Sequence, residues 1–108
     1  MKKFGNSPKE KGATRNAKYH LCLFVAGDES NSKLARENLT KLCEGRLKGH
    51  YELEVVDVLE DFQAALDNNV LITPTLLLVA PPPPVMVVGT LSNTERVLTA
   101  LRLNGGER

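Results

Sequence analysis

Apolar residues come in short runs that are separated by polar stretches. Residues 20–26 are almost continuously apolar and end at Gly27, which predicts a first strand that is covered on both faces. The polar turn 28–32 offers several helix N-caps. Apolar residues then recur at helical spacing: Ala35, Leu39, Leu42, Cys43 and Leu47. Gly49 suits the C-terminal cap of the helix that this spacing predicts.

A second strand is predicted where apolar and polar residues alternate. The alternation covers residues 51–55 and continues to Val58. A helix between two such strands is typical of a parallel βαβ unit, whose crossover is right-handed. Asp61 can cap a short helix that ends near residues 68–69.

The following segment mixes β-forming residues with prolines. Residues 70–80 are β-branched and aliphatic, but Pro74 interrupts them. The prolines at 81–84 cannot join a central ladder, because proline has no N–H to donate. Residues 85–88 predict a short strand that Gly89 ends.

The last predicted element is a helix. Residues 92–95, Ser-Asn-Thr-Glu, read as a capping box with the serine as N-cap, and the helix runs through Leu101. The element order is then βαβαββα, which is the thioredoxin arrangement, so we expect an α/β thioredoxin-like fold. We expect one domain over residues 19–104, a flexible basic arm at residues 1–18 and a short tail at residues 105–108.

Composition and charge narrow the class of protein. Of the 108 residues, 42% are apolar and 25% are charged, as in soluble globular proteins. Residues 1–18 hold six Lys/Arg and one acid, against a net charge of +1 for the whole chain. Aromatic interleaving and a basic helix are missing, so we expect no nucleic-acid partner. We also expect no membrane partner and a cytoplasmic protein, because no apolar leader or membrane-length run is visible and cysteines are few.

The sequence lacks the groups that thioredoxin chemistry requires. A redox thioredoxin needs Cys-x-x-Cys at the start of its first long helix, where the helix dipole stabilises a thiolate. Residues 27–32 contain no thiol and two carboxylates, while Cys22 and Cys43 occupy apolar positions. His20 has too few neighbouring ligands for a metal site. We therefore expect no catalytic residue, metal or cofactor, and Asp57 is expected to cap a turn, bond a hydroxyl or end a strand.

Five motifs in order carry a family resemblance. They are Phe-Val-Ala-Gly at 24–27, Val-Val-Asp-Val-Leu at 55–59, Thr-Pro-Thr-Leu at 73–76, the proline run and Gly-Thr-Leu-Ser-Asn at 89–93. On these motifs the chain resembles the KaiB family over about residues 18–103. Thioredoxin-like domains place a cis-proline just before a strand, as at Pro74, although the sequence leaves the isomer open.

The resemblance implies a fold and a function. KaiB proteins are not enzymes; clock members bind the ATPase ring of the KaiC hexamer, sequester KaiA and compete with a sensor kinase. Their ground state is usually a homotetramer with a rearranged βαββααβ order. We therefore expect a non-catalytic adaptor that forms a dimer or tetramer and regulates a KaiC-like ATPase in circadian rhythm or stress adaptation. A thioredoxin-like redox protein and a KaiC-independent oligomeric signalling module remain alternatives.

Departures from the family pattern mark candidate partner-binding positions. Clock members carry basic residues where this chain has Asn69, Leu78, Val85 and Met86. After Tyr51 they present a small residue and a lysine to KaiA, where this chain has two acids, so KaiA is a doubtful partner. The candidate binding residues are Tyr51, Glu52, Glu54, Asn69, Leu78, Val85 and Met86.

Other departures bear on the choice between the two folds. Many clock members have Gly and Asp where this chain has Ala100 and Arg102. Alanine exceeds glycine in helix propensity by about 1 kcal/mol, and arginine suits the C-terminal end of a helix. We expect the thioredoxin-like form to be relatively more populated here, with Pro74 and Gly89 as further switch positions. The departures also suggest a divergent, non-cyanobacterial-type member.

Overall fold

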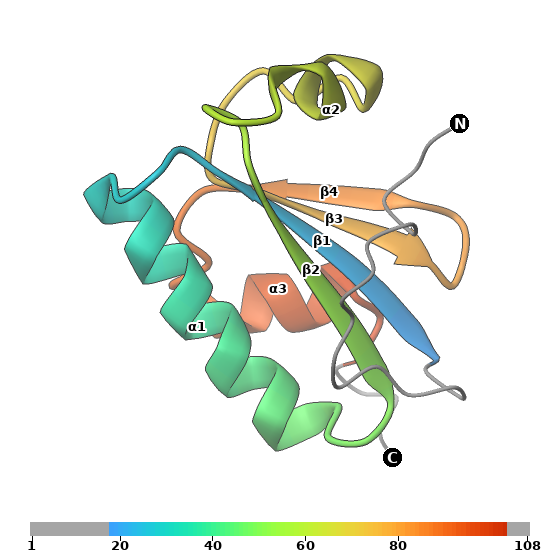
Figure 1. The fold of residues 1–108 in the computed structure, drawn as a ribbon. Coiled ribbons are helices and arrows are strands. Elements are labelled where there is room, and N and C mark those ends of the chain that lie inside the picture. The colour runs from blue at the N-terminus through green and yellow to red at the C-terminus, as the bar shows by residue number, and fades with distance from the viewer. Residues whose placement is uncertain (1–17, 104–108) are drawn as a thin grey trace.

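The computed structural model describes residues 18–103 as a four-stranded sheet with three helices (Figure 1). The arm predicted at residues 1–18 and the tail at 105–108 lie outside the described residues, except for Lys18. The elements in chain order are β1 (Tyr19–Val25), α1 (Ser30–Arg46), β2 (Tyr51–Asp57), α2 (Phe62–Asp67), β3 (Thr75–Ala80), β4 (Val85–Val88) and α3 (Thr94–Ala100).

The sheet has the strand order β2-β1-β3-β4. Strands β1 and β2 are parallel, and Tyr19 lies opposite Tyr51 in the register. Strand β3 is antiparallel to both β1 and β4. A βαβ unit followed by a ββα unit confirms the predicted thioredoxin-like βαβαββα order.

Side chains on the two faces of the sheet build two separate cores, because successive strand residues point to opposite faces. On one face, β1 and β3 pack against α1 and α3; the buried residues include Leu23, Leu39, Leu76, Leu78 and Leu101. On the other face, the sheet packs against α2; the buried residues are Cys22, Phe24, Val56, Ala65, Val70 and Leu77. Figure 1 shows α2 on the opposite side of the sheet from α1 and α3.

Two predicted helix boundaries were wrong. The first helix ends at Arg46 with Leu47 as its cap, and Gly49 instead supplies the turn into β2 with a φ of 81°. The last helix is capped by Asn93, whose side chain accepts from the Arg96 N–H, and not by Ser92. The Ser92 hydroxyl is instead hydrogen-bonded to Thr90 Oγ1 at 2.7 Å, which takes it away from the helix N-terminus.

The proline-rich half is less regular than the sequence pattern indicates. Only Thr75–Ala80 of the predicted segment 70–80 forms a strand. The Thr73–Pro74 peptide bond is cis, and the Pro74 carbonyl accepts from the Gly89 N–H at 2.9 Å. Residues 81–84 connect β3 to β4 without joining the sheet, as predicted.

Candidate functional site

The sheet face that carries α2 is only partly covered. Helix α2 spans six residues, and of these Ala65 is the buried one. We call the α2 face the surface formed by residues 58–72 together with the side chains of β3 and β4 that point to the same side. A groove of about 510 Å³ runs along it, lined by Asp67, Asn68, Asn69, Leu77, Val79, Pro84, Val85 and Met86.

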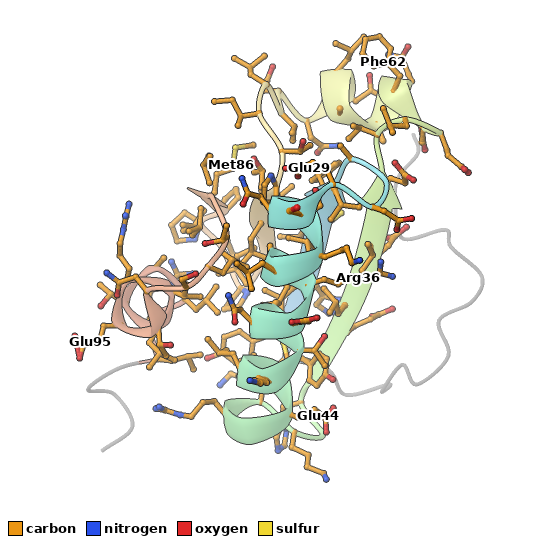
Figure 2. The ribbon with its side chains drawn as sticks, turned by 90° about the vertical axis from the view of Figure 1, so that its left-hand side faces the viewer. Glu29, Arg36, Glu44, Phe62, Met86 and Glu95 are labelled. Carbon is orange, nitrogen blue, oxygen red and sulfur yellow. The ribbon has the colours of Figure 1, made fainter. Side chains whose placement is uncertain are left out.

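Large apolar side chains gather on the α2 face. Of the nine exposed large hydrophobic residues in the described part of the chain, eight belong to it: Leu59, Phe62, Leu66, Leu71, Ile72, Val79, Met86 and Val88. Leu71 is 88% exposed and Leu59 is 73% exposed. Figure 2 shows Phe62 at the α2 end of the molecule, away from Glu44 on α1. Exposed apolar side chains gathered in this way mark interaction sites.

The groove brings together three of the predicted partner-binding residues. Asn69 ends the turn after α2 with a φ of 59°, and Val85 and Met86 begin β4. Val85 also lines the groove, although it pairs with Leu78 and packs against the core on the α1 and α3 side of the sheet. Residue pairing within the β3–β4 hairpin places Met86 opposite Leu77, so that both point to the α2 face. This placement depends on the hairpin that the proline run connects.

Leu78 does not belong to this surface, which corrects the prediction for it. Its side chain is 0% exposed and lies in the core beneath α1 and α3. Its neighbours Leu77 and Val79 point to the α2 face instead. The sequence placed Leu78 at a partner-facing position because the family resemblance does not show to which face of the strand it points.

Tyr51 is also separated from the acids that follow it. The Tyr51 ring packs toward α1, and its hydroxyl donates to Glu44 Oε2 at 2.6 Å. This hydrogen bond to a carboxylate raises the pKa of Tyr51 to about 12. Glu52 and Glu54 point to the other side of β2, where Glu52 Oε1 lies 3.2 Å from His20 Nδ1. The three residues therefore do not form one surface.

The turn that follows β1 contains capping and turn hydrogen bonds and no reactive thiol. Asp57, at the end of β2, accepts from the backbone N–H groups of Gly27 and Leu59, each at 3.0 Å. Glu29 caps α1 by accepting from the Ser32 N–H at 3.0 Å. Asp57 therefore ends a strand and caps a turn, two of the three roles expected for it.

Both thiols are unsuited to nucleophilic chemistry. Cys22 is 1% exposed and Cys43 is 0% exposed. Burial raises the pKa of Cys43 to about 12, and burial with the nearby Glu54 carboxylate raises the pKa of Cys22 further. Since the thiolate is the nucleophile, neither residue is activated at neutral pH. Within residues 18–103 no group of three or more His, Cys, Asp or Glu could hold a metal ion.

The candidate switch residues Ala100 and Arg102 lie at, and just beyond, the C-terminal end of α3. Ala100 is the last residue of α3, and Arg102 lies beyond the helix with a φ of 61°. Arg102 Nη2 donates to the carbonyl of Pro81 at 2.8 Å and lies 3.4 Å from that of Pro83. Arg102 thus lies just beyond the C-terminal cap of α3, and its guanidinium binds the proline run.

Comparison with known proteins decides the family. The KaiB domain profile matches residues 22–103. The chain belongs to the KaiB family. The circadian clock oscillator protein KaiB of Thermostichus vulcanus is 46% identical over 85 residues, which cover 79% of each chain. A KaiB of Prochlorococcus marinus is 40% identical over 100 residues, covering 83% of this chain and 93% of the relative.

Solved structures extend this KaiB assignment to the fold. The N-terminal domain of SasA from Synechococcus elongatus superposes with a TM-score of 0.66 at 16% identity, covering 93% of this chain and 98% of that domain. Mitochondrial thioredoxin 3 from Saccharomyces cerevisiae gives a TM-score of 0.66 at 20% identity and covers 82% of each chain. This KaiB-family chain therefore has a thioredoxin-like fold. No helix of residues 18–103 is both long and apolar enough to span a bilayer.

Sequence reasoning missed the most exposed residues of the α2 face. Phe62 and Leu66 lie on the short helix predicted after Asp61, and their side chains are 64% and 50% exposed. Leu71 and Ile72 were assigned to a β-rich segment, but they lie in the connection before β3. The available signal was the shortness of the helix, because six residues cannot cover a whole sheet face.

Proposed function

We propose that the chain is a non-catalytic adaptor that binds a KaiC-like ATPase hexamer through the α2 face, in circadian rhythm or stress-adaptation signalling. The observation that carries the proposal is the set of eight exposed apolar side chains on the α2 face of a KaiB-family fold, two of which, Val79 and Met86, line a groove of about 510 Å³. Contact between exposed apolar side chains and water is unfavourable in free energy. A protein partner that covers these side chains removes the unfavourable contact.

Several features support an adaptor without catalysis. The turn at residues 27–32 contains no thiol, and Gly27, Glu29 and Ser32 take part in capping and turn hydrogen bonds. Burial raises the pKa values of the two described thiols. An insulin-reduction assay tests this part of the proposal: we expect no turnover, and activity that Cys22→Ser or Cys43→Ser abolishes would sink it.

The partner set differs from that of clock members in one respect. Glu52 and Glu54 lie on an edge strand, where their charge disfavours a partner that is built to meet a lysine. We therefore do not propose KaiA as a partner. A sensor kinase is a candidate competitor, since the SasA N-terminal domain has the same fold. We also propose a cytoplasmic homo-oligomer as the resting state.

A binding measurement with the organism's own KaiC-like ATPase tests the proposal. We expect the full chain to bind the hexamer and the binding to depend on ATP. Phe62→Ala combined with Met86→Ala is expected to weaken binding at least about tenfold, equivalent to about 1.4 kcal/mol. Leu34→Ala is the matched control, because Leu34 is an exposed leucine on α1, 42% accessible, away from the α2 face.

Two outcomes contradict the proposal. If the wild-type chain does not bind the hexamer with or without ATP, a KaiC-independent oligomeric module becomes the better interpretation. If Leu34→Ala weakens binding as much as the double variant, binding does not use the α2 face.

A further inference from the structure

Charges of opposite sign lie on different elements of the molecule. Between Lys48 and Arg96 the sequence contains no Lys or Arg but seven acids: Glu52, Glu54, Asp57, Glu60, Asp61, Asp67 and Glu95. This stretch contains β2, α2, β3 and β4. The cations of the described residues lie at Lys18, on α1 and the turn after it, and at Arg96 and Arg102 in the α3 region.

The α2 face consequently has carboxylates and no cationic side chain. Glu60, Asp61 and Asp67 are exposed and alternate with the exposed apolar residues of the same segment. Asp67 also lines the groove, next to Asn68 and Asn69. Helices α1 and α3, which carry most of the cations, pack on the opposite face of the sheet.

We infer that the α2 face docks a protein surface that is apolar at its centre and carries Lys or Arg at its rim. The inference rests on the proposed function and adds the sign of charge that the partner must present. Rim carboxylates speed the encounter with a basic partner and disfavour an acidic one. The same charge disfavours nucleic acid and anionic lipid, which present phosphates.

Two occupants from within the protein fit less well. The arm at residues 1–17 is basic, but its large apolar side chains are Met1 and Phe4, too few to cover eight exposed ones. The α1 surface of a second copy is also basic. Among the described residues, however, Leu34 is the one exposed large hydrophobic side chain of α1. A second α2 face would bring carboxylates against carboxylates. A separate partner supplies both the charge and the apolar area.

Two amphipathic helical peptides with the same leucines test the inference without any natural partner. One peptide has lysines at its polar positions and the other has glutamates. Each is titrated into the full-length ¹⁵N-labelled chain and followed by NMR. We expect the lysine peptide to bind at least about tenfold more tightly and to shift the amides of residues 59–72 and 85–88.

Charge reversal supplies the matched variants. Glu60→Lys with Asp67→Lys is expected to abolish or invert the preference between the peptides. Glu37→Lys with Glu95→Lys changes the net charge equally on α1 and α3 and is expected to preserve the preference; Figure 2 shows Glu95 away from Phe62. Equal affinity for both peptides, or shifts confined to α1 and α3, would overturn the inference.

The same NMR spectra also show whether a second copy or the arm at residues 1–17 covers the α2 face. Concentration-dependent shifts of the α2 amides without peptide would show that a second copy covers the face. Shifts of those amides in Lys2→Gln with Lys3→Gln would show that the arm covers it. Either result would overturn the inference.

The inference and the proposed function fail separately. A lysine-peptide preference without binding to the KaiC-like hexamer contradicts the proposed partner and leaves the charge assignment standing. Binding to the hexamer that becomes tighter in Glu60→Lys with Asp67→Lys contradicts the charge assignment alone.

Discussion

At the residue scale, Asp57 joins three segments through one carboxylate oxygen. Its Oδ1 accepts from Gly27 N–H and Leu59 N–H, and so fixes the turn before α1 against the connection to α2. Asp57→Ala leaves both donors without this acceptor and is expected to lower the free energy of unfolding by about 1–3 kcal/mol in urea titrations. Asp28→Ala, in the same turn, is the control, and an equal effect of the two variants would contradict this role.

The pKa of Tyr51 gives a second test at this scale. Its hydrogen bond to Glu44 raises the pKa from 10 to about 12, because the folded state favours the protonated phenol. Stability that depends on this bond is therefore complete below about pH 10 and is lost as the pH rises from about 10 to about 12. In a Tyr19→Phe background, phenolate absorbance should titrate near pH 12, and at a lower pH after Glu44→Gln. No change after Glu44→Gln would contradict the assignment.

At the element scale, the sequence predicted the helices and strands better than it predicted on which face of the sheet each strand residue lies. Apolar runs, alternation, helical spacing and capping residues located all seven elements, because these signals reflect local burial and helix ends. The face of the sheet to which each strand residue points depends on pairing between distant strands. Pairing places Met86 on the α2 face, and burial at the opposite face removes Leu78 from it. The hydrogen bond between Tyr51 and Glu44 likewise requires α1 to be packed on β2.

Strand β3 offers a direct test of this two-faced arrangement. Leu78 is 0% exposed beneath α1 and α3, whereas Val79 is 40% exposed on the α2 face. Leu78→Ala is expected to destabilise the protein by about 2–5 kcal/mol, through lost burial and the cavity that it leaves. Val79→Ala is expected to cost less than about 1 kcal/mol. Chemical unfolding measures both, and a larger cost for Val79→Ala would show that β3 presents its other face to the core.

At the scale of the whole molecule, we expect two alternative packings of the C-terminal half. The family resemblance implies a rearranged C-terminal half, and the short β-forming segments between prolines have no overwhelming local preference. In the thioredoxin-like form, Arg102 joins the end of the chain to the β3–β4 connection through the Pro81 carbonyl. The identities of Ala100 and Arg102 were visible in the sequence. The Arg102 contact was not, because it links two loops 21 residues apart.

This contact and the helix propensity of Ala100 together determine the last prediction. Replacing alanine by glycine at the end of α3 costs about 1 kcal/mol, and loss of a surface hydrogen bond from a guanidinium costs about the same. Ala100→Gly with Arg102→Asp should therefore lower the ratio of the thioredoxin-like form to the rearranged form by about 30-fold.

NMR measures this population shift. In the wild-type chain we expect helical chemical shifts over Thr94–Ala100 and cross-strand contacts between Leu77 and Met86. The double variant should weaken these signals, and a strand should replace helix over residues 97–103. Arg102→Asn separates the two contributions, because asparagine tolerates the φ of 61° at this position while removing the guanidinium. A wild-type chain with a strand over residues 97–103 as its sole form would show that these two residues do not favour the thioredoxin-like packing, since the form in which they act would not be populated.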